Sequence, residues 1–160
     1  MRTPATVLLA EALSVDAFSG RLTAFNILDA IVAPKVPAQF GKLTAAILYE
    51  LSEESARFSE RVSIRSADER TIAHGLGKIE LVQRSPDGIP STHRSLYSFW
   101  NLRIDSFSDH SIVVEQAESE AGPWIEVARR RVAVVEGLLP GQPAPLASPV
   151  LPDEARSSGE

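Results

Sequence analysis

The sequence predicts an all-β protein: a single antiparallel β-sandwich of about eight strands, followed by a disordered C-terminal tail. Three observations carry this prediction. Apolar and polar residues alternate with a period of two in several segments, which is typical of half-buried strands. Turn-forming residues separate these segments at intervals of about 10–15 residues. No long segment shows the 3.6-residue period of an amphipathic helix.

The composition is that of a folded domain. The chain has 160 residues, of which 44% are apolar, so it can form one sizeable core. It has no cysteine, which excludes disulfides, thiolate metal sites and cysteine nucleophiles and fits a reducing compartment. The early apolar run is interrupted by Glu11 and Asp16, unlike a secretory signal. A membrane span needs about 20 apolar residues, which the chain lacks, so we expect a cytoplasmic protein.

The N-terminal region predicts a hairpin. Residues 5–12 carry good helix formers but are cut short by turn residues, so a strand is favoured. The turn is placed at Asp16–Gly20. The following segment, Arg21–Val32, is apolar on both faces, which predicts a central strand that is covered on both sides. Ala33–Pro37 contains two prolines and therefore predicts an extended crossover or an edge.

The next strands are predicted from alternation. The segment 42–52 gives the cleanest pattern, with one apolar face made by Leu43, Ala45, Ile47, Tyr49 and Leu51. Phe58, Val62 and Ile64 alternate with polar residues in a second half-exposed strand. In the long strand 72–82 the apolar phase slips by one residue at Gly75 and Gly77, which predicts a β-bulge.

The second half of the domain predicts three more strands. A turn at Ser85–Gly88 leads into a loop that continues to about residue 94. An aromatic-rich strand covers 96–104, and Asp105–His110 forms a turn. Segments 112–118 and 124–135 form a terminal hairpin, in which Arg129–Arg131 interrupts the alternation and predicts a bulge or an exposed edge. The domain is therefore expected to span 1–136. Residues 137–160, with five prolines, three glycines and three serines, are expected to be a disordered tail.

A family resemblance rests on the N-terminal pair of strands. Leu8–Ala12, a short turn, Gly20–Ile31 and the step at Pro34 and Val36–Ala38 resemble small bacterial proteins built on one domain of unknown function. Residues 99–107 and 110–135 are similar to that family's last core strand and closing hairpin, so the resemblance covers about 5–136. It implies a compact β-sandwich and supplies no catalytic residues.

Two sets of carboxylates are the candidate site residues. Glu11, Asp16 and Asp29 lie in or beside apolar strands, where a buried acid pair could do acid–base work, although such residues more often cap turns or face solvent. Asp105, Asp109 and His110 suggest a calcium loop. That site would also need Asp87 or Asp68 to converge from other loops, and a plain turn is favoured.

The remaining motifs favour structural roles. His74, His93 and His110 form no metal-ligand motif; His74 is expected to be partly buried in a strand, and the other two to lie in loops. No nucleophile elbow or phosphate loop is present, so we predict no catalytic, cofactor or metal site.

Two surface features bear on partners. Arg129–Arg131 could contact phosphate or an acidic partner, but a charged edge strand is the favoured interpretation. The aromatic residues Tyr97, Phe99, Trp100 and Trp124 are expected in the core, with Trp124 a candidate contact residue. The net charge of −5 disfavours nucleic-acid binding.

These observations lead to two functional hypotheses. The favoured one is a non-enzymatic binding or interaction module with a protein partner, because a well-patterned core comes with no assembled catalytic set. The alternative is a metal-dependent ligand-binding or hydrolytic domain that uses loop carboxylates and His110. The sequence leaves the oligomeric state open.

Overall fold

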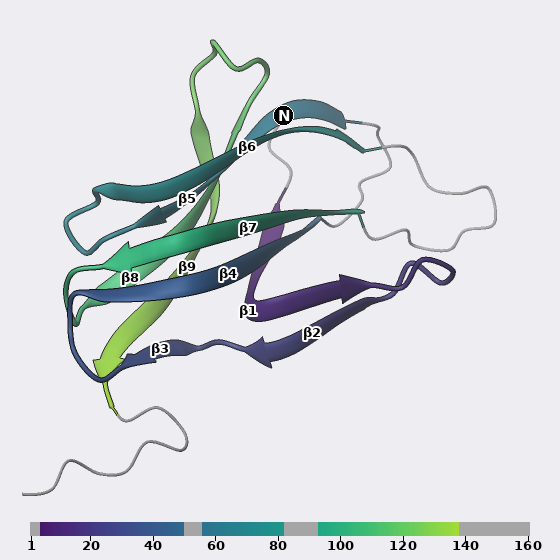
Figure 1. Cartoon of the computed structure of the whole chain (residues 1–160). Helices are drawn as coiled ribbons and strands as arrows, with labels where there is room; N and C mark the ends of the chain where they lie inside the picture. The colour runs from purple at the N-terminus through teal and green to yellow at the C-terminus, as the bar shows by residue number, and fades with distance from the viewer. Residues whose placement is uncertain (1–3, 50–55, 82–92, 138–160) are drawn as a thin grey trace, which may run out of the picture.

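The computed structural model describes residues 4–49, 56–81 and 93–137 and contains strands but no helix in these ranges. Figure 1 shows the nine strands. Their bounds are β1 (Ala5–Val15), β2 (Leu22–Ile27), β3 (Ala30–Ala33), β4 (Ala38–Tyr49), β5 (Ala56–Arg65), β6 (Thr71–Leu81), β7 (His93–Ile104), β8 (Asp109–Ala117) and β9 (Ile125–Glu136). The all-β prediction is therefore confirmed.

The strands form two sheets. Sheet A has four strands in the order β2-β1-β4-β7 and is antiparallel throughout. Sheet B has five strands in the order β3-β9-β8-β5-β6, and β3 runs parallel to β9. The prediction of about eight strands is close to the nine observed, but the prediction that all are antiparallel is wrong, because β3 is parallel to β9. The segment expected to be one strand divides into β2 and β3, and β3 crosses into the other sheet.

The division of this segment also overturns its predicted central position. β2 is the outermost strand of sheet A. Near its end, Asn26 has a positive φ of 52°, a conformation that asparagine tolerates better than most residues. The chain then leaves sheet A: the N–H of Leu28 donates to Leu9 O at 2.9 Å, and β3 begins at Ala30. The bends at 34–37, predicted as a crossover, carry the chain back to β4 in sheet A.

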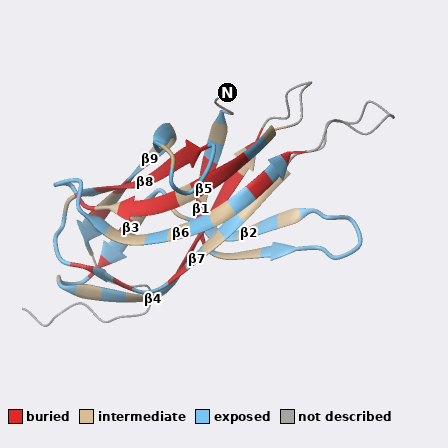
Figure 2. Ribbon diagram, turned by 90° about the horizontal axis from the view of Figure 1, so that it is seen from above, coloured by how far each residue is buried: buried red, intermediate tan, exposed pale blue. Residues whose placement is uncertain are grey.

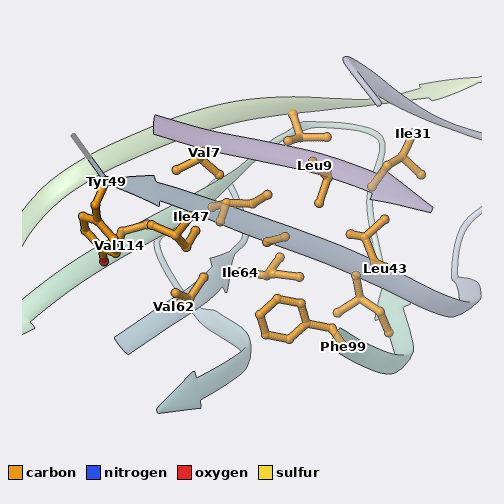
Figure 3. Close-up of a cluster of buried hydrophobic side chains, with 14 of the residues drawn as sticks. Val7, Leu9, Ile31, Leu43, Ile47, Tyr49, Val62, Ile64, Phe99 and Val114 are labelled. Atoms are coloured by element: carbon orange, nitrogen blue, oxygen red, sulfur yellow. The ribbon is translucent and has the colours of Figure 1, made fainter. Parts of the chain in front are cut away.

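The hydrophobic core draws on both sheets. Figure 3 shows Leu9 and Ile47 of sheet A near Ile64 of sheet B, and all three belong to one cluster of buried side chains. The face predicted for β4 is confirmed, since Leu43, Ala45, Ile47 and Tyr49 are all buried. In Figure 2 the buried residues follow the inner strands, while the β1–β2 hairpin is mostly exposed. Burial of this apolar surface is the main stabilising contribution to the fold.

The predicted bulge at Gly75–Gly77 is not present. Pairing between β5 and β6 is continuous there, with Gly75 opposite Val62 and Gly77 opposite Glu60. The register of this pair shifts instead at Ile64/Arg65, and that of β8 and β9 shifts at Val114/Glu115. The second shift skips Val127, two residues before Arg129, so a bulge near the arginines is confirmed. The predicted edge is confirmed in part: β3 covers only Ala133–Glu136 of β9, and Arg129–Arg131 pair with β8 alone.

The two hairpins lie where they were predicted, although β7 begins at His93 rather than at 96 and β8 at Asp109 rather than at 112. The first hairpin turns at Asp16–Gly20, and β8 and β9 pair as the terminal hairpin. The Ser85–Gly88 turn lies outside the described residues, as does the predicted tail apart from Gly137. β9 ends at Glu136. In the described ranges there is no helix that is long and apolar enough to cross a membrane.

Candidate functional site

A buried carboxyl group, Glu60, lies between the two sheets. Glu60 has the same phase in β5 as Phe58, Val62 and Ile64, which point into the core, and its side chain is fully buried. The sequence reasoning missed this residue. The signal was present, because Glu60 is the only charged residue on an otherwise apolar face of a strand with period-two alternation.

Two hydroxyl groups from sheet A bind this carboxyl group. Ser95 Oγ and Tyr97 OH, both on β7, donate to Glu60 Oε1 at 2.5 and 2.7 Å. The second oxygen, Oε2, is buried and has no hydrogen-bond partner among the residues that the structure describes. Burial raises the pKa of Glu60 above its ordinary value, and the two donated hydrogen bonds offset part of that rise. Burial and the neighbouring Glu60 also raise the pKa of Tyr97, so Tyr97 remains a hydrogen-bond donor.

The two glycines of β6 make room for Tyr97. A Cβ atom on Gly75 would lie 2.5 Å from Cδ1 of the Tyr97 ring, and one on Gly77 would lie 2.5 Å from the Tyr97 hydroxyl oxygen. Both positions point inward, in phase with the buried Ile79 and Leu81. The apolar phase of β6 therefore does not slip at Gly75 or Gly77. Glycine replaces the expected apolar residue because an aromatic ring from the other sheet fills the space. We call Glu60, Ser95, Tyr97, Gly75 and Gly77 the buried seam.

Alanine at Gly75 is expected to destabilise the protein. The new methyl group would overlap the Tyr97 ring, and overpacking of this kind costs about 1–3 kcal/mol. The matched control is Gly41→Ala in β4, where no atom lies within 4 Å of the added Cβ. Urea denaturation of both variants measures the difference. Equal free energies of unfolding for the two variants would show that Tyr97 does not lie against β6.

The buried seam is better placed to join the sheets than to act on a substrate. A pocket of about 870 Å³ is lined by residues such as Phe58, Gln116 and Ile125, and no residue of the buried seam is among its lining residues. Both hydroxyl groups donate to Glu60, and the Glu60 side chain is fully buried, so its carboxyl group is closed to a substrate from solvent. The contacts of the buried seam link β5 and β6 of sheet B to β7 of sheet A.

A second link between the sheets is made by Arg130. From β9, its guanidinium group donates to Val7 O at 3.1 Å and to Leu28 O at 2.8 Å, and pairs with Asp29 Oδ1 at 2.8 Å. The side chain is only 22% exposed. It therefore holds the end of β2 and the start of β1 against sheet B.

The three consecutive arginines thus have different roles. Arg129 forms ion pairs with Glu69 at 2.6 Å and with Glu126 at 2.9 Å, and these bonds lower the pKa of both carboxyl groups. Arg130 links the sheets, and Arg131 is exposed. Two of the three cations are therefore paired within the chain, which weakens the predicted phosphate contact.

The predicted strand carboxylates do not form a buried pair. Glu11 is exposed and accepts a hydrogen bond from the Asn26 amide at 2.8 Å. Asp16 caps the hairpin turn, and Asp29 pairs with Arg130 at the surface. The interpretation of these residues as turn and surface groups is correct, and the buried acid is Glu60 instead.

The loop carboxylates and histidines also lie apart. Asp105 pairs with Arg103 at 2.7 Å, and Asp68 accepts a hydrogen bond from Ser66. Over the described ranges, no group of three or more histidine, cysteine, aspartate or glutamate residues could hold a metal ion. Asp87 lies outside those ranges.

All three histidine predictions need correction. His74 is exposed on β6, although it was expected to be partly buried. His93 begins β7 rather than lying in a loop. His110 is buried in β8, with Nδ1 3.0 Å from Ser108 O.

The outer face of sheet B is covered by paired charges. Glu115 is contacted by Arg61 at 2.8 Å and Arg65 at 3.0 Å. The half-buried Trp124 stacks on the Arg61 guanidinium, 4.6 Å from the ring centroid. Trp124, predicted as a candidate contact residue, therefore already contacts Arg61 of the same chain. Trp100, which was expected in the core, is 65% exposed beneath Lys42.

The β1–β2 hairpin has the opposite character, because it exposes large apolar side chains. Phe18 at its tip is fully exposed, and Val15, Phe25 and Ile27 are 41–55% exposed. The tip is nevertheless well ordered by hydrogen bonds. Asp16 Oδ1 accepts from Ser19 N at 2.5 Å and from Phe18 N at 3.1 Å, bonds that lower the pKa of Asp16. Arg94 of β7 also donates to Gly20 O.

Comparison with known proteins supports the predicted resemblance. Residues 5–123, from the start of β1 to the end of the β8–β9 turn, match the family of unknown function DUF6941. No curated protein matches the chain. The matched region contains the exposed hairpin and every residue of the buried seam. The chain therefore belongs to the DUF6941 family.

Proposed function

We propose that this protein is a non-enzymatic interaction module that binds a protein partner through its β1–β2 hairpin. The single observation that carries the proposal is Phe18, a fully exposed aromatic side chain on an ordered turn. A large apolar side chain in water is unfavourable, and exposed apolar groups gathered in one place mark contact surfaces. The two sheets with their shared core are then the two layers of a β-sandwich that presents the hairpin.

The geometry of the turn supports binding by insertion. Asp16 and the N–H···O bond from Gly20 to Asp16 O, at 2.9 Å, hold the loop in one conformation. A pre-ordered loop loses little conformational entropy on binding. Phe18 is therefore suited to fill an apolar pocket on the partner, the usual role of an aromatic anchor at an interface.

The contrast between surfaces supports this choice of site. The outer face of sheet B satisfies its charges internally through Arg61, Arg65, Arg129 and their acidic partners. At the hairpin tip, by contrast, the apolar side chain of Phe18 is fully exposed. A lipid surface is disfavoured as the target because the chain has a net charge of −5 and the tip carries Asp16.

Site-specific photo-crosslinking tests the proposal. A photoreactive phenylalanine analogue is placed at position 18 in the full chain and, as a matched control, at Leu76, which is 53% exposed on β6. Crosslinking in cells of the native host should give one discrete protein adduct from position 18 and none from position 76. The same adducts from both positions would overturn the proposal. So would lipid adducts alone at position 18, or co-sedimentation of the chain with anionic vesicles that depends on Phe18.

A further inference from the structure

We propose that β2 is covered in solution by β2 of a second copy of this chain, so that two sheets A join edge to edge. The observation is an unprotected sheet edge. β2 is the outermost strand of sheet A and contains neither a charged residue nor a proline. A second strand along this free edge would pair its open backbone groups.

The four outermost strands differ in how their free edges are protected. β7 carries Arg94 and Arg103, and β6 carries Lys78 and Glu80. β3 has only four residues and is followed by Pro34. Charge, proline and short length are the usual means by which proteins prevent edge pairing. β2, with the sequence Leu-Thr-Ala-Phe-Asn-Ile, has six residues and neither a charge nor a proline.

The free edge offers backbone groups for pairing. The N–H of Asp16 donates to Arg21 O at 2.9 Å, so the carbonyl of Arg21 faces β1. Backbone groups of successive residues in a strand alternate between its two edges. Leu22 and Ala24 therefore direct their N–H and C=O groups away from β1, toward the open side. Phe25 and Ile27, both more than half exposed, lie in the same strand.

The charges at the two ends of β2 favour a second copy over an unrelated strand. Arg21 immediately precedes the strand, and Asp29 follows it by two residues. In an antiparallel pair of identical strands, the start of each strand lies near the end of the other. Arg21 of one copy would then approach Asp29 of its partner, twice about the two-fold axis. Asp29 keeps this capacity because its side chain is 94% exposed while it pairs with Arg130.

This inference is independent of the Phe18 contact, since the tip lies beyond the end of β2. Phe18→Ser should weaken binding to the protein captured at position 18 and keep the dimer, so failure of one proposal leaves the other intact.

A charge introduced at the two-fold axis tests the pairing. When Arg21 faces Asp29 of the other copy, the half-exposed Phe25 lies at the axis, so Phe25→Lys would place like charges opposite each other. Sedimentation of the full chain should show a dimer, and Phe25→Lys and Phe25→Glu should each weaken it at least about tenfold. A mixture of the two variants should recover the dimer, and Leu76→Lys on β6 should leave it unchanged.

Three results would overturn the inference. They are a wild-type chain that stays monomeric at every concentration, an equal loss of the dimer in Leu76→Lys, and a mixture that does not reassociate although circular dichroism shows both variants folded. The mixing experiment separates lost pairing from lost folding, because unfolded variants could not restore a dimer.

Discussion

Arg130→Ala is expected to lower the free energy of unfolding by about 3 kcal/mol, since it removes charge-assisted hydrogen bonds and leaves the carbonyls of Val7 and Leu28 without their donor. The loss should be large because three acceptors from two separate segments of the chain depend on one guanidinium group. Urea denaturation followed by tryptophan fluorescence measures it.

The neighbouring arginine is the control. Arg131→Ala removes the same side chain from the same strand at an exposed position, and its effect should stay within about 0.5 kcal/mol. Arg130→Lys should recover only part of the stability, because an ammonium group cannot reproduce the planar fork of arginine. If Arg130→Ala and Arg131→Ala were equally stable, the link between the sheets through Arg130 would be refuted.

The second large effect is the pH dependence that Glu60 imposes on stability. Its pKa is raised in the folded state from an ordinary value of 4.5, so over the range above 4.5 the folded chain binds more protons than the unfolded chain. The contribution of Glu60 to stability is therefore fully present below pH 4.5 and falls as the pH rises through the raised pKa. Each unit of the pKa difference corresponds to about 1.4 kcal/mol.

Glu60→Gln isolates this effect. The amide oxygen can still accept the bonds from Ser95 and Tyr97, but the group no longer titrates. Between pH 5 and pH 8 (roughly the range above the ordinary carboxyl pKa), the variant should gain stability relative to wild type as the pH rises. Glu69 and Glu126, whose pKa values are lowered by Arg129, act in the opposite direction in both proteins and cancel in the difference. A difference that does not change with pH would show that Glu60 is not a buried titrating group.

The parts of the fold that could be predicted are those in which local pattern and burial agree. The inner face of β4 follows directly from alternation, since Leu43, Ala45, Ile47 and Tyr49 are all buried. The first turn follows from Asp16 and Gly20, whose side-chain and backbone preferences act locally. These features need no knowledge of the rest of the chain.

The wrong predictions arise where a segment that is distant in the sequence determines the local structure. Gly75 and Gly77 suggest a bulge when β6 is considered alone, and only the Tyr97 ring from the other sheet explains them. Arg129–Arg131 suggests an edge, but the role of Arg130 depends on carbonyl groups more than 100 positions earlier in the chain. Glu60 could have been identified, because its phase in β5 places a carboxyl group in the core. Its partners on β7 could not, since pairing between sheets leaves no local pattern.

The central claim is that the β1–β2 hairpin is the contact surface of this domain. The most direct test is the affinity of the full chain for the protein captured at position 18, measured for wild type, Phe18→Ser and Leu76→Ser. We predict that Phe18→Ser weakens binding by about tenfold or more while Leu76→Ser binds as wild type does. Equal affinities for the two variants would contradict the claim.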